Sequence, residues 1–185
     1  MALTESNMLP LGTTAPSFEL PDVVDGQSKS YSQLRGTAAT VVMFICNHCP
    51  YVIHVNEELV RIANDYSSKG VNFIAISSND VENYPDDSPE KMRLIAKVLR
   101  YPFPYLYDDS QEVANNYKAA CTPDFYLFDS EDTLVYRGRL DGSRPGNDIP
   151  LSGSDLRFAL DSCLLGIKEI APQIPSAGCN IKWKA

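Results

Sequence analysis

The feature that most constrains the fold is an apolar run that leads directly into a helical pattern. Residues 40–45 are apolar almost throughout and rich in β-branched side chains, which is typical of a strand buried on both faces of a parallel sheet. After Pro50, apolar side chains recur at spacings of three and four until Gly70, which predicts an amphipathic helix. A buried strand followed by a helix is the repeating unit of an α/β domain.

Strand and helix patterns alternate along the rest of the chain. Further strands are expected at 71–78, 101–108, 124–129 and 133–141, and further helices after Ser88, Ser110 and Ser154. An Asp25–Gly26 turn predicts an N-terminal hairpin. We therefore predict a single domain over residues 1–185 with an α/β fold. Its central mixed sheet is flanked by helices, with an N-terminal β-hairpin extension and an irregular C-terminal tail over 171–185.

Composition limits the function classes. A formal net charge of −8 argues against a nucleic-acid or anionic-membrane partner, because both require clustered Lys and Arg. No apolar run is long enough to cross a bilayer, and residues 1–16 lack the basic and apolar regions of a signal peptide, so we expect a cytoplasmic protein. Five cysteines is an odd number, and a reducing compartment keeps most of them as thiols. A structural disulfide framework is therefore not expected.

Two cysteines mark the junction between the first buried strand and its helix. Cys46 and Cys49 are expected at the carboxyl end of the strand and in the first helical turn, where function sits in open α/β sheets. The partial positive charge of a helix N-terminus stabilises a thiolate, and a Cys-X-X-Cys pair lowers a cysteine pKa from about 8.5 to roughly 3.5–7.5. A protonated His48 between them would lower it further. The sequence therefore predicts a redox dithiol.

This cysteine pair has two other interpretations, as buried core thiols or as part of a zinc site. Buried core thiols are disfavoured because Asn47, His48 and Pro50 flank the pair and do not resemble core residues. A zinc site needs about four ligands. The further ligands that the sequence offers are His54, Cys121 and Cys179, at unconvincing spacings. We therefore predict no metal and no organic cofactor.

The motif and its surroundings resemble a known family. The segments "CNHC" and "CTPDFYLFD", followed by a closing hairpin and helix, resemble the thioredoxin fold, and "GTTAPSFELPDVVDGQSKSYSQLRG" resembles the entry segment of the AhpC/TSA redoxin branch. The tail "GCNIKW" is similar to that of a subgroup of thioredoxin-like redoxins. The resemblance implies that Pro123 is a cis-proline packed beside the dithiol and that Thr122 presents its backbone to a substrate disulfide.

The chain also departs from the thioredoxin pattern. Ile45 stands where thioredoxin has a tryptophan, His48 stands where it has a proline, and Thr40 falls near the place of its buried acid. Threonine cannot accept a proton as that acid does. These departures leave the redox potential and the partner open.

The resemblance leaves two alternatives to disulfide exchange. In the peroxiredoxin pattern, Cys49 takes the peroxidatic position, while Cys46 replaces the Thr or Ser and Val42 replaces the proline. These replacements weaken a peroxidase, whose arginine would have to be Arg137 or Arg139. Copper binding resembles that of Sco-type redoxins, whose cysteine pair is one residue wider.

We predict a thiol–disulfide oxidoreductase. Cys46, as the more exposed sulfur, is expected to attack a protein or small-molecule disulfide, and Cys49 is expected to resolve the mixed disulfide. A partner reductase would supply the electrons. A thiol-dependent peroxidase acting on hydroperoxides is the first alternative, and a copper-binding redoxin is the second.

The remaining cysteines receive separate predictions. Cys121 is expected near the dithiol, either as a further thiol of the site or as a small residue buried in a tight loop. Cys179 is hypothesised to be a third redox thiol that resolves a sulfenate or mixed disulfide, and Cys163 is expected to pack in the core. Trp183 is expected to hold the tail against the body, and the acidic stretch 79–90 to form a solvated loop. The oligomeric state stays open.

Overall fold

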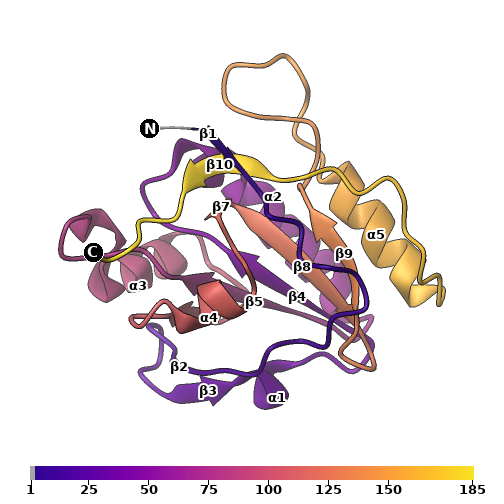
Figure 1. Cartoon of the computed structure of the whole chain (residues 1–185), viewed down its shortest axis with the longest axis horizontal. Helices are drawn as coiled ribbons and strands as arrows, with labels where there is room; N and C mark the ends of the chain where they lie inside the picture. Colours follow the sequence, from indigo (N-terminus) through magenta and orange to yellow (C-terminus); the bar gives the residue numbers. More distant parts are fainter. Residues whose placement is uncertain (1–2) are drawn as a thin grey trace.

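A computed structural model of the protein describes residues 3–185 and has a five-stranded central sheet (Figure 1). The strand order is β6-β5-β4-β8-β9. These strands are β4 (Ala39–Phe44), β5 (Val71–Ser77), β6 (Tyr105–Tyr107), β8 (Asp124–Asp129) and β9 (Leu134–Gly138). β8 runs antiparallel to both of its neighbours, whereas β4, β5 and β6 are parallel to one another. The predicted mixed sheet is confirmed.

Strand β4 lies at the centre of the sheet and is buried along its whole length. Val41 and Met43 pack into one apolar cluster, and Val42 and Phe44 pack into a second cluster on the opposite face. Successive side chains of a strand point to opposite faces, so a strand that is covered on both sides must be apolar at every position. The uninterrupted apolar run has this cause.

Helices cover both faces of the sheet. They are α1 (Tyr31–Leu34), α2 (Pro50–Ser67), α3 (Pro89–Val98), α4 (Glu112–Asn116) and α5 (Ser154–Leu164), with a short 3₁₀ helix, η1 (Pro85–Asp87). The apolar stripes of α2, α3 and α5 pack into the cluster that contains Val41 and Met43. Side chains from α1, α4 and the N-terminal segment pack into the other cluster. None of the helices within 3–185 is long and apolar enough to cross a membrane.

The N-terminal hairpin was predicted correctly. Strands β2 (Glu19–Pro21) and β3 (Ser28–Ser30) pair antiparallel, with Asp25 and Gly26 in the connecting loop. Gly26 has a φ of +75°, which glycine adopts without steric cost.

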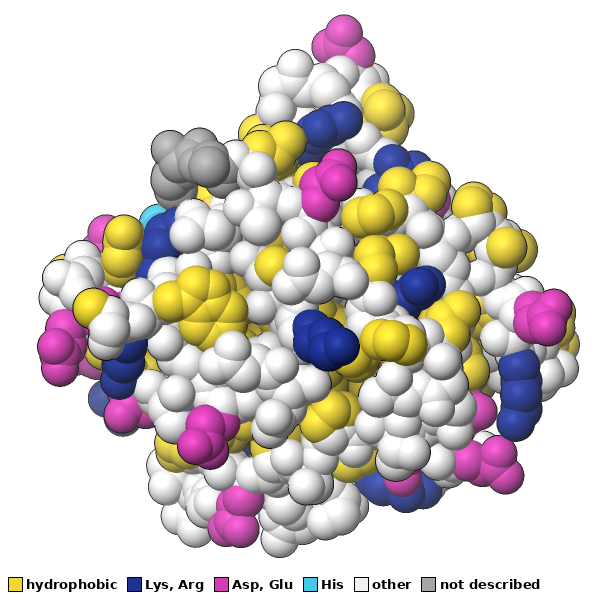
Figure 2. All heavy atoms as spheres, viewed as in Figure 1, with side chains coloured by type: hydrophobic (Ala, Val, Ile, Leu, Met, Phe, Trp, Pro, Cys, Tyr) yellow, Lys and Arg dark blue, Asp and Glu magenta, His cyan; other side chains and the backbone are white. Residues whose placement is uncertain are grey.

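On the face of the molecule in Figure 2, Lys and Arg side chains are spread singly among acidic and apolar ones.

The C-terminal tail is more regular than predicted. Strand β10 (Ala177–Asn180) lies between β1 (Leu3–Glu5) and β7 (Cys121–Thr122) in a three-stranded antiparallel sheet (Figure 1). The expectation of an irregular tail is therefore wrong for these four residues. A strand this short carries no recognisable periodicity, and both of its partners are remote in the sequence.

The residue that holds the tail was also predicted wrongly. Trp183 is 42% exposed, whereas the neighbouring Ile181 is buried in the apolar cluster of Val42 and Phe44. The backbone N–H of Lys182 donates to Asn79 Oδ1 at 2.8 Å. An aliphatic side chain and backbone hydrogen bonds therefore fix the tail.

Candidate active site

The dithiol lies where the central strand meets the first long helix. Strand β4 ends at Phe44, and Cys49 is the N-cap residue of α2, which begins at Pro50. Proline suits the first helical position because its missing N–H would have no partner there. Cys49 was expected inside the first turn and lies directly before it. Cys46 is the more exposed of the two cysteines, as predicted, but at 3% against 0% both are buried.

Thr122 and Pro123 pack beside both sulfurs. The peptide bond between these two residues is cis. The Sγ of Cys46 lies 3.4 Å from Thr122 Oγ1, and the Cys49 thiol lies 3.3 Å from the Thr122 carbonyl oxygen. Cys49 and the tail strand therefore enclose this carbonyl, because Thr122 pairs with Cys179 in the β7–β10 ladder. The expectation that Thr122 presents its backbone openly to a substrate is not met here.

The tail brings a third thiol to the dithiol. The Sγ atoms of Cys179 and Cys49 are joined by a hydrogen bond, with 2.8 Å between them, and Cys179 is 3% exposed. Gly178 makes this approach feasible, since a Cβ at that position would lie 2.0 Å from the Thr122 carbonyl oxygen. Cys49 therefore has a thiol neighbour in the tail as well as one in its own motif.

The three thiols hold their protons unequally. Hydrogen bonds from Cys46 and then from Cys179 lower the pKa of Cys49 to about 5, against the opposing effect of burial. The pKa of Cys46 is raised by its hydrogen bond to Cys49, by burial and by the charge of Asp87. Burial, followed by the hydrogen bond to Cys49, raises the pKa of Cys179 to about 12. The reduced site therefore carries its thiolate on Cys49, whereas the sequence analysis expected it on Cys46.

The other two cysteines have ordinary surroundings. Cys121 is fully buried, and burial raises its pKa well above the usual range for a thiol. Its sulfur lies 3.9 Å from the Ser176 carbonyl oxygen. Cys121 is therefore a small buried residue, as one of the two predictions had it, but it lies in strand β7 and not in a tight loop. Cys163 is half-buried and packs against the apolar cluster under α5, as predicted.

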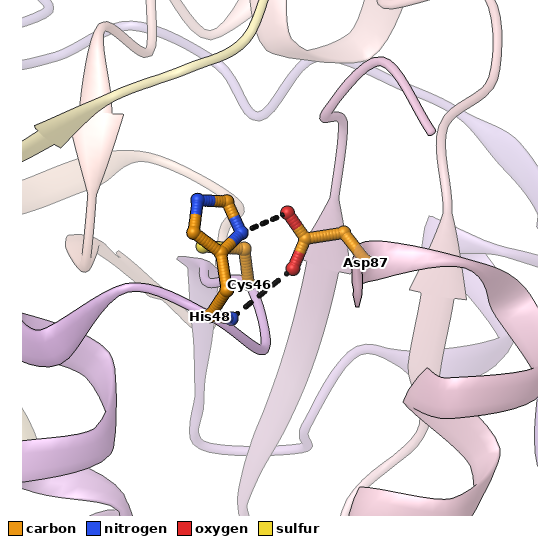
Figure 3. Close-up of side chains that lie close together, drawn as sticks. All are labelled: Cys46, His48 and Asp87. Carbon is orange, nitrogen blue, oxygen red and sulfur yellow. Dashed lines mark hydrogen bonds and ion pairs between the residues drawn. The ribbon is translucent and has the colours of Figure 1, made fainter. Parts of the chain in front are cut away.

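A buried carboxylate organises the residues between the two cysteines. Asp87 is fully buried and accepts hydrogen bonds from His48 Nδ1 at 2.6 Å and from the His48 backbone N–H at 3.2 Å (Figure 3). The Asn47 backbone N–H also donates to it, at 2.7 Å. It also accepts from Asn79 Nδ2 at 2.7 Å. The His48 ring stacks on Tyr84, with 5.9 Å between the ring centroids. Asp87 therefore fixes the loop that carries the dithiol.

Asp87 is a site residue that the sequence pattern does not reveal. The stretch 79–90 is predicted to form a solvated loop, but Asn79, Asp80 and Asp87 within it are buried. Asp87 and His48 are 39 residues apart, and no sequence motif relates the two positions. A carboxylate among other acidic residues gives no sign in the sequence that the chain folds it inward.

Three potential metal ligands lie close together beside the dithiol. Within residues 3–185, Cys46, His48 and Asp87 bring one potential ligand atom each to within 4.8 Å of one another. The further zinc ligands considered in the sequence, His54, Cys121 and Cys179, are not among these three residues. His54 bonds through Nε2 to Ser143 Oγ at 3.0 Å, in a half-buried pocket beside Pro123.

The two arginines named for a peroxidase have other partners. Arg137 donates through Nε to the Leu9 carbonyl oxygen at 2.8 Å, and Arg139 pairs with Asp155 at 2.7 Å. Across residues 3–185, no hydrogen bond joins either guanidinium to a cysteine sulfur. The site thus holds three cysteine sulfurs, one of them the Cys49 thiolate, and neither of these two arginines is hydrogen-bonded to them.

The fold and the site define a thioredoxin-fold protein with a Cys-X-X-Cys pair at the start of a helix. The sequence profile of the AhpC/TSA family matches residues 11–137, and the chain belongs to this family. The structure resembles that of a putative thioredoxin from Neisseria meningitidis, with a TM-score of 0.62 and 23% identity over 80% of this chain and 88% of that one.

Three other proteins are similar to this chain. An uncharacterized conserved protein from Geobacillus kaustophilus is 59% identical, with a TM-score of 0.97 over 100% of this chain and 97% of that one. A hypothetical protein from Sinorhizobium meliloti 1021 is 45% identical, with a TM-score of 0.95 over 98% and 99% of the two chains. A thiol:disulfide interchange protein, DsbE, from Allochromatium vinosum is 27% identical over 66% of this chain, which spans 63% of that protein's length.

Proposed function

We propose that this member of the thiol–disulfide oxidoreductase class exchanges disulfides through the Cys46–Cys49 dithiol. One observation carries the proposal: the sulfurs of Cys46 and Cys49 lie together beside Thr122 and the cis Thr122–Pro123 bond at a helix N-terminus, where the pKa of Cys49 is lowered to about 5. A thiolate and its protonated neighbour are what the two successive steps of disulfide exchange require.

In the first step, the Cys46 thiol passes its proton along the hydrogen bond to Cys49 and attacks one sulfur of the substrate disulfide. A mixed disulfide forms on Cys46, and the other substrate sulfur leaves as a thiolate. Cys49 thus accepts the proton, a task for which the buried Thr40 has no suitable group.

In the second step, the Cys49 thiol gives its proton to the departed thiolate and attacks Cys46 Sγ. The Cys46–Cys49 disulfide forms and the second substrate sulfur leaves as a thiolate, which takes a proton from solvent. The substrate thus gains two electrons from the dithiol and two protons, one from the dithiol and one from solvent. A partner reductase returns the dithiol to its reduced state, and no organic cofactor is required. The substrate is a protein or small-molecule disulfide, and a cytoplasmic location stays a prediction.

His48 and Asp87 serve as positioning residues. Asp87 accepts a hydrogen bond from His48 Nδ1 and so fixes the ring beside the dithiol. The hydrogen bond to Cys49 and burial raise the pKa of Cys46 most, and the charge of Asp87 raises it further.

The experiment is disulfide mapping of the protein oxidised by excess oxidised glutathione, beside an insulin reduction assay. We expect a Cys46–Cys49 disulfide and insulin reduction in the wild type and in Cys163→Ser, and loss of activity in Cys46→Ser and in Cys49→Ser. Cys163 is the matched control because it packs under α5, outside the site. Insulin reduction that survives Cys46→Ser would contradict the proposal.

A peroxidase is the second candidate, and the lowered pKa of Cys49 favours it. The Cys49 thiolate would attack a hydroperoxide, releasing the alcohol or water and leaving a sulfenic acid, which a second thiol would convert to a disulfide with loss of water. Stopped-flow oxidation by hydrogen peroxide separates the candidates. Fast oxidation that persists in Cys46→Ser and disappears in Cys49→Ser would identify the peroxidase.

A copper-binding redoxin is the remaining alternative, with Cys46, His48 and Asp87 as its ligands. It predicts stoichiometric copper after reconstitution and no insulin reduction. The hydrogen bonds that Asp87 already accepts from His48 and Asn79 compete with such a metal.

A further inference from the structure

We propose that Cys179 is a second resolving thiol, which forms a disulfide with Cys49 as an alternative to the Cys46–Cys49 disulfide. This inference rests on the proposed function, because it needs Cys49 to take part in thiol–disulfide exchange. It assigns the C-terminal tail a direct part in the chemistry of the site.

The geometry of the reduced site carries the inference. The Sγ atoms of Cys49 and Cys179 are 2.8 Å apart, which is within hydrogen-bond distance. Both residues are buried, so no solvent layer separates them. A disulfide requires the two sulfurs to approach further to about 2.05 Å, a movement of less than one ångström.

The tail is built to hold Cys179 in this place. Cys179 pairs with Thr122 on one side and with Leu3 on the other, so β10 is fixed along both of its edges. The carbonyl oxygen of Thr122 occupies the space that a side chain at position 178 would need. Ile181 anchors the chain on the far side of the strand. These contacts fix the position of the Cys179 sulfur next to Cys49.

The chemistry balances without any cofactor. When a disulfide such as oxidised glutathione reacts with the Cys49 thiolate, a Cys49–glutathione disulfide forms and one glutathione thiolate leaves. That thiolate takes the proton of Cys179, and the Cys179 thiolate attacks Cys49 Sγ. The Cys49–Cys179 disulfide forms and the second glutathione leaves.

The same disulfide is reachable from the oxidised dithiol. The Cys179 thiolate attacks Cys49 Sγ in the Cys46–Cys49 disulfide, and Cys46 leaves as a thiolate that recovers the proton. No electrons enter or leave, so the exchange moves the disulfide into the tail and restores a free thiol at Cys46. Cys49 would then be the shared sulfur of two alternative disulfides.

The test uses the full chain with Cys46→Ser, so that Cys49 cannot pair within its own motif. Its comparison variants are Cys46→Ser/Cys179→Ser and, as a matched control, Cys46→Ser/Cys163→Ser. Each reduced protein is mixed with oxidised glutathione, quenched with acid and N-ethylmaleimide at successive times, and examined by intact-mass and peptide mass spectrometry. Circular dichroism of each variant establishes that it is folded.

In Cys46→Ser and in the Cys163 control we expect a brief Cys49–glutathione adduct that converts to a Cys49–Cys179 disulfide. In Cys46→Ser/Cys179→Ser the adduct should last at least about tenfold longer, because the neighbouring thiol that displaces glutathione is gone. Equal adduct lifetimes with and without Cys179 would overturn the inference.

Wild-type protein in the same experiment separates this inference from the proposed function. A Cys46–Cys49 disulfide in the wild type with no Cys49–Cys179 disulfide in Cys46→Ser overturns the role of Cys179 and leaves the oxidoreductase standing. A wild type that forms a Cys49–Cys179 disulfide and never a Cys46–Cys49 disulfide would overturn the proposed dithiol cycle and support the tail thiol.

Discussion

Replacing Asp87 by Asn tests whether the buried carboxylate organises the active-site loop. The substitution keeps the size of the side chain and turns one carboxylate oxygen into an NH₂ group. Oδ1 accepts the backbone N–H of Asn47, while Oδ2 accepts from His48 Nδ1 and Asn79 Nδ2. If the amide oxygen remains toward the backbone, the NH₂ group faces two donors and loses both hydrogen bonds.

The expected loss of stability can be estimated from these hydrogen bonds. A hydrogen bond to a charged group contributes about 1.5–3 kcal/mol, and a buried donor left without a partner has a further cost. His48 recovers part of this if its ring changes tautomer, so we expect Asp87→Asn to lower the free energy of unfolding by about 3 kcal/mol. That is a large share of the roughly 5–15 kcal/mol that stabilises a typical domain.

The assay is urea denaturation of the reduced protein at neutral pH, followed by circular dichroism. Asp86→Asn is the matched control, because Asp86 is the preceding residue and its side chain is 69% exposed in an ion pair with Lys91. An exposed pair of this kind contributes at most about 1 kcal/mol. If Asp87→Asn proved as mild as Asp86→Asn, the argument that the carboxylate holds the loop would be refuted.

Three further predictions concern the thiolate, the tail and a buried acid. The rate at which iodoacetamide alkylates Cys49 in the reduced protein should show an inflection near pH 5, and an inflection near pH 9 would contradict the assignment of the thiolate. Because folding lowers this pKa, the stability that the Cys49 thiolate adds, measured as wild type against Cys49→Ser, should be fully present above about pH 9 and lost as the pH falls toward 5. Gly178→Ala should destabilise the protein by about 1–3 kcal/mol in urea denaturation, because its Cβ meets the Thr122 carbonyl oxygen, whereas Gly142→Ala, whose Cβ has neighbours no closer than 3.5 Å, should not. Burial raises the pKa of Asp124 from 3.8 to about 7, so Asp124→Asn should gain thermal stability relative to the wild type as the pH rises between these values, and a difference independent of pH would contradict the assignment.

The sequence determined the α/β class, the central sheet and the place of the dithiol. The short, β-branched apolar run at 40–45 is typical of a strand covered on both faces, and Pro50 marks where the following helix begins. Because β4 and α2 are adjacent in the chain, the position of Cys46 and Cys49 at their junction followed from local pattern alone. The backbone geometry of this junction depends on neighbours within a few residues.

Tertiary structure alone decided the electrostatics of the site. Asp87 reaches His48 across 39 residues, and Cys179 reaches Cys49 across 130 residues, and both contacts depend on how separate elements pack. The pKa of a thiol depends on which charges and donors lie within a few ångströms of it, whatever their distance along the chain. For this reason the sequence located the two cysteines correctly, while only the folded chain placed the thiolate on Cys49 and a third sulfur beside it.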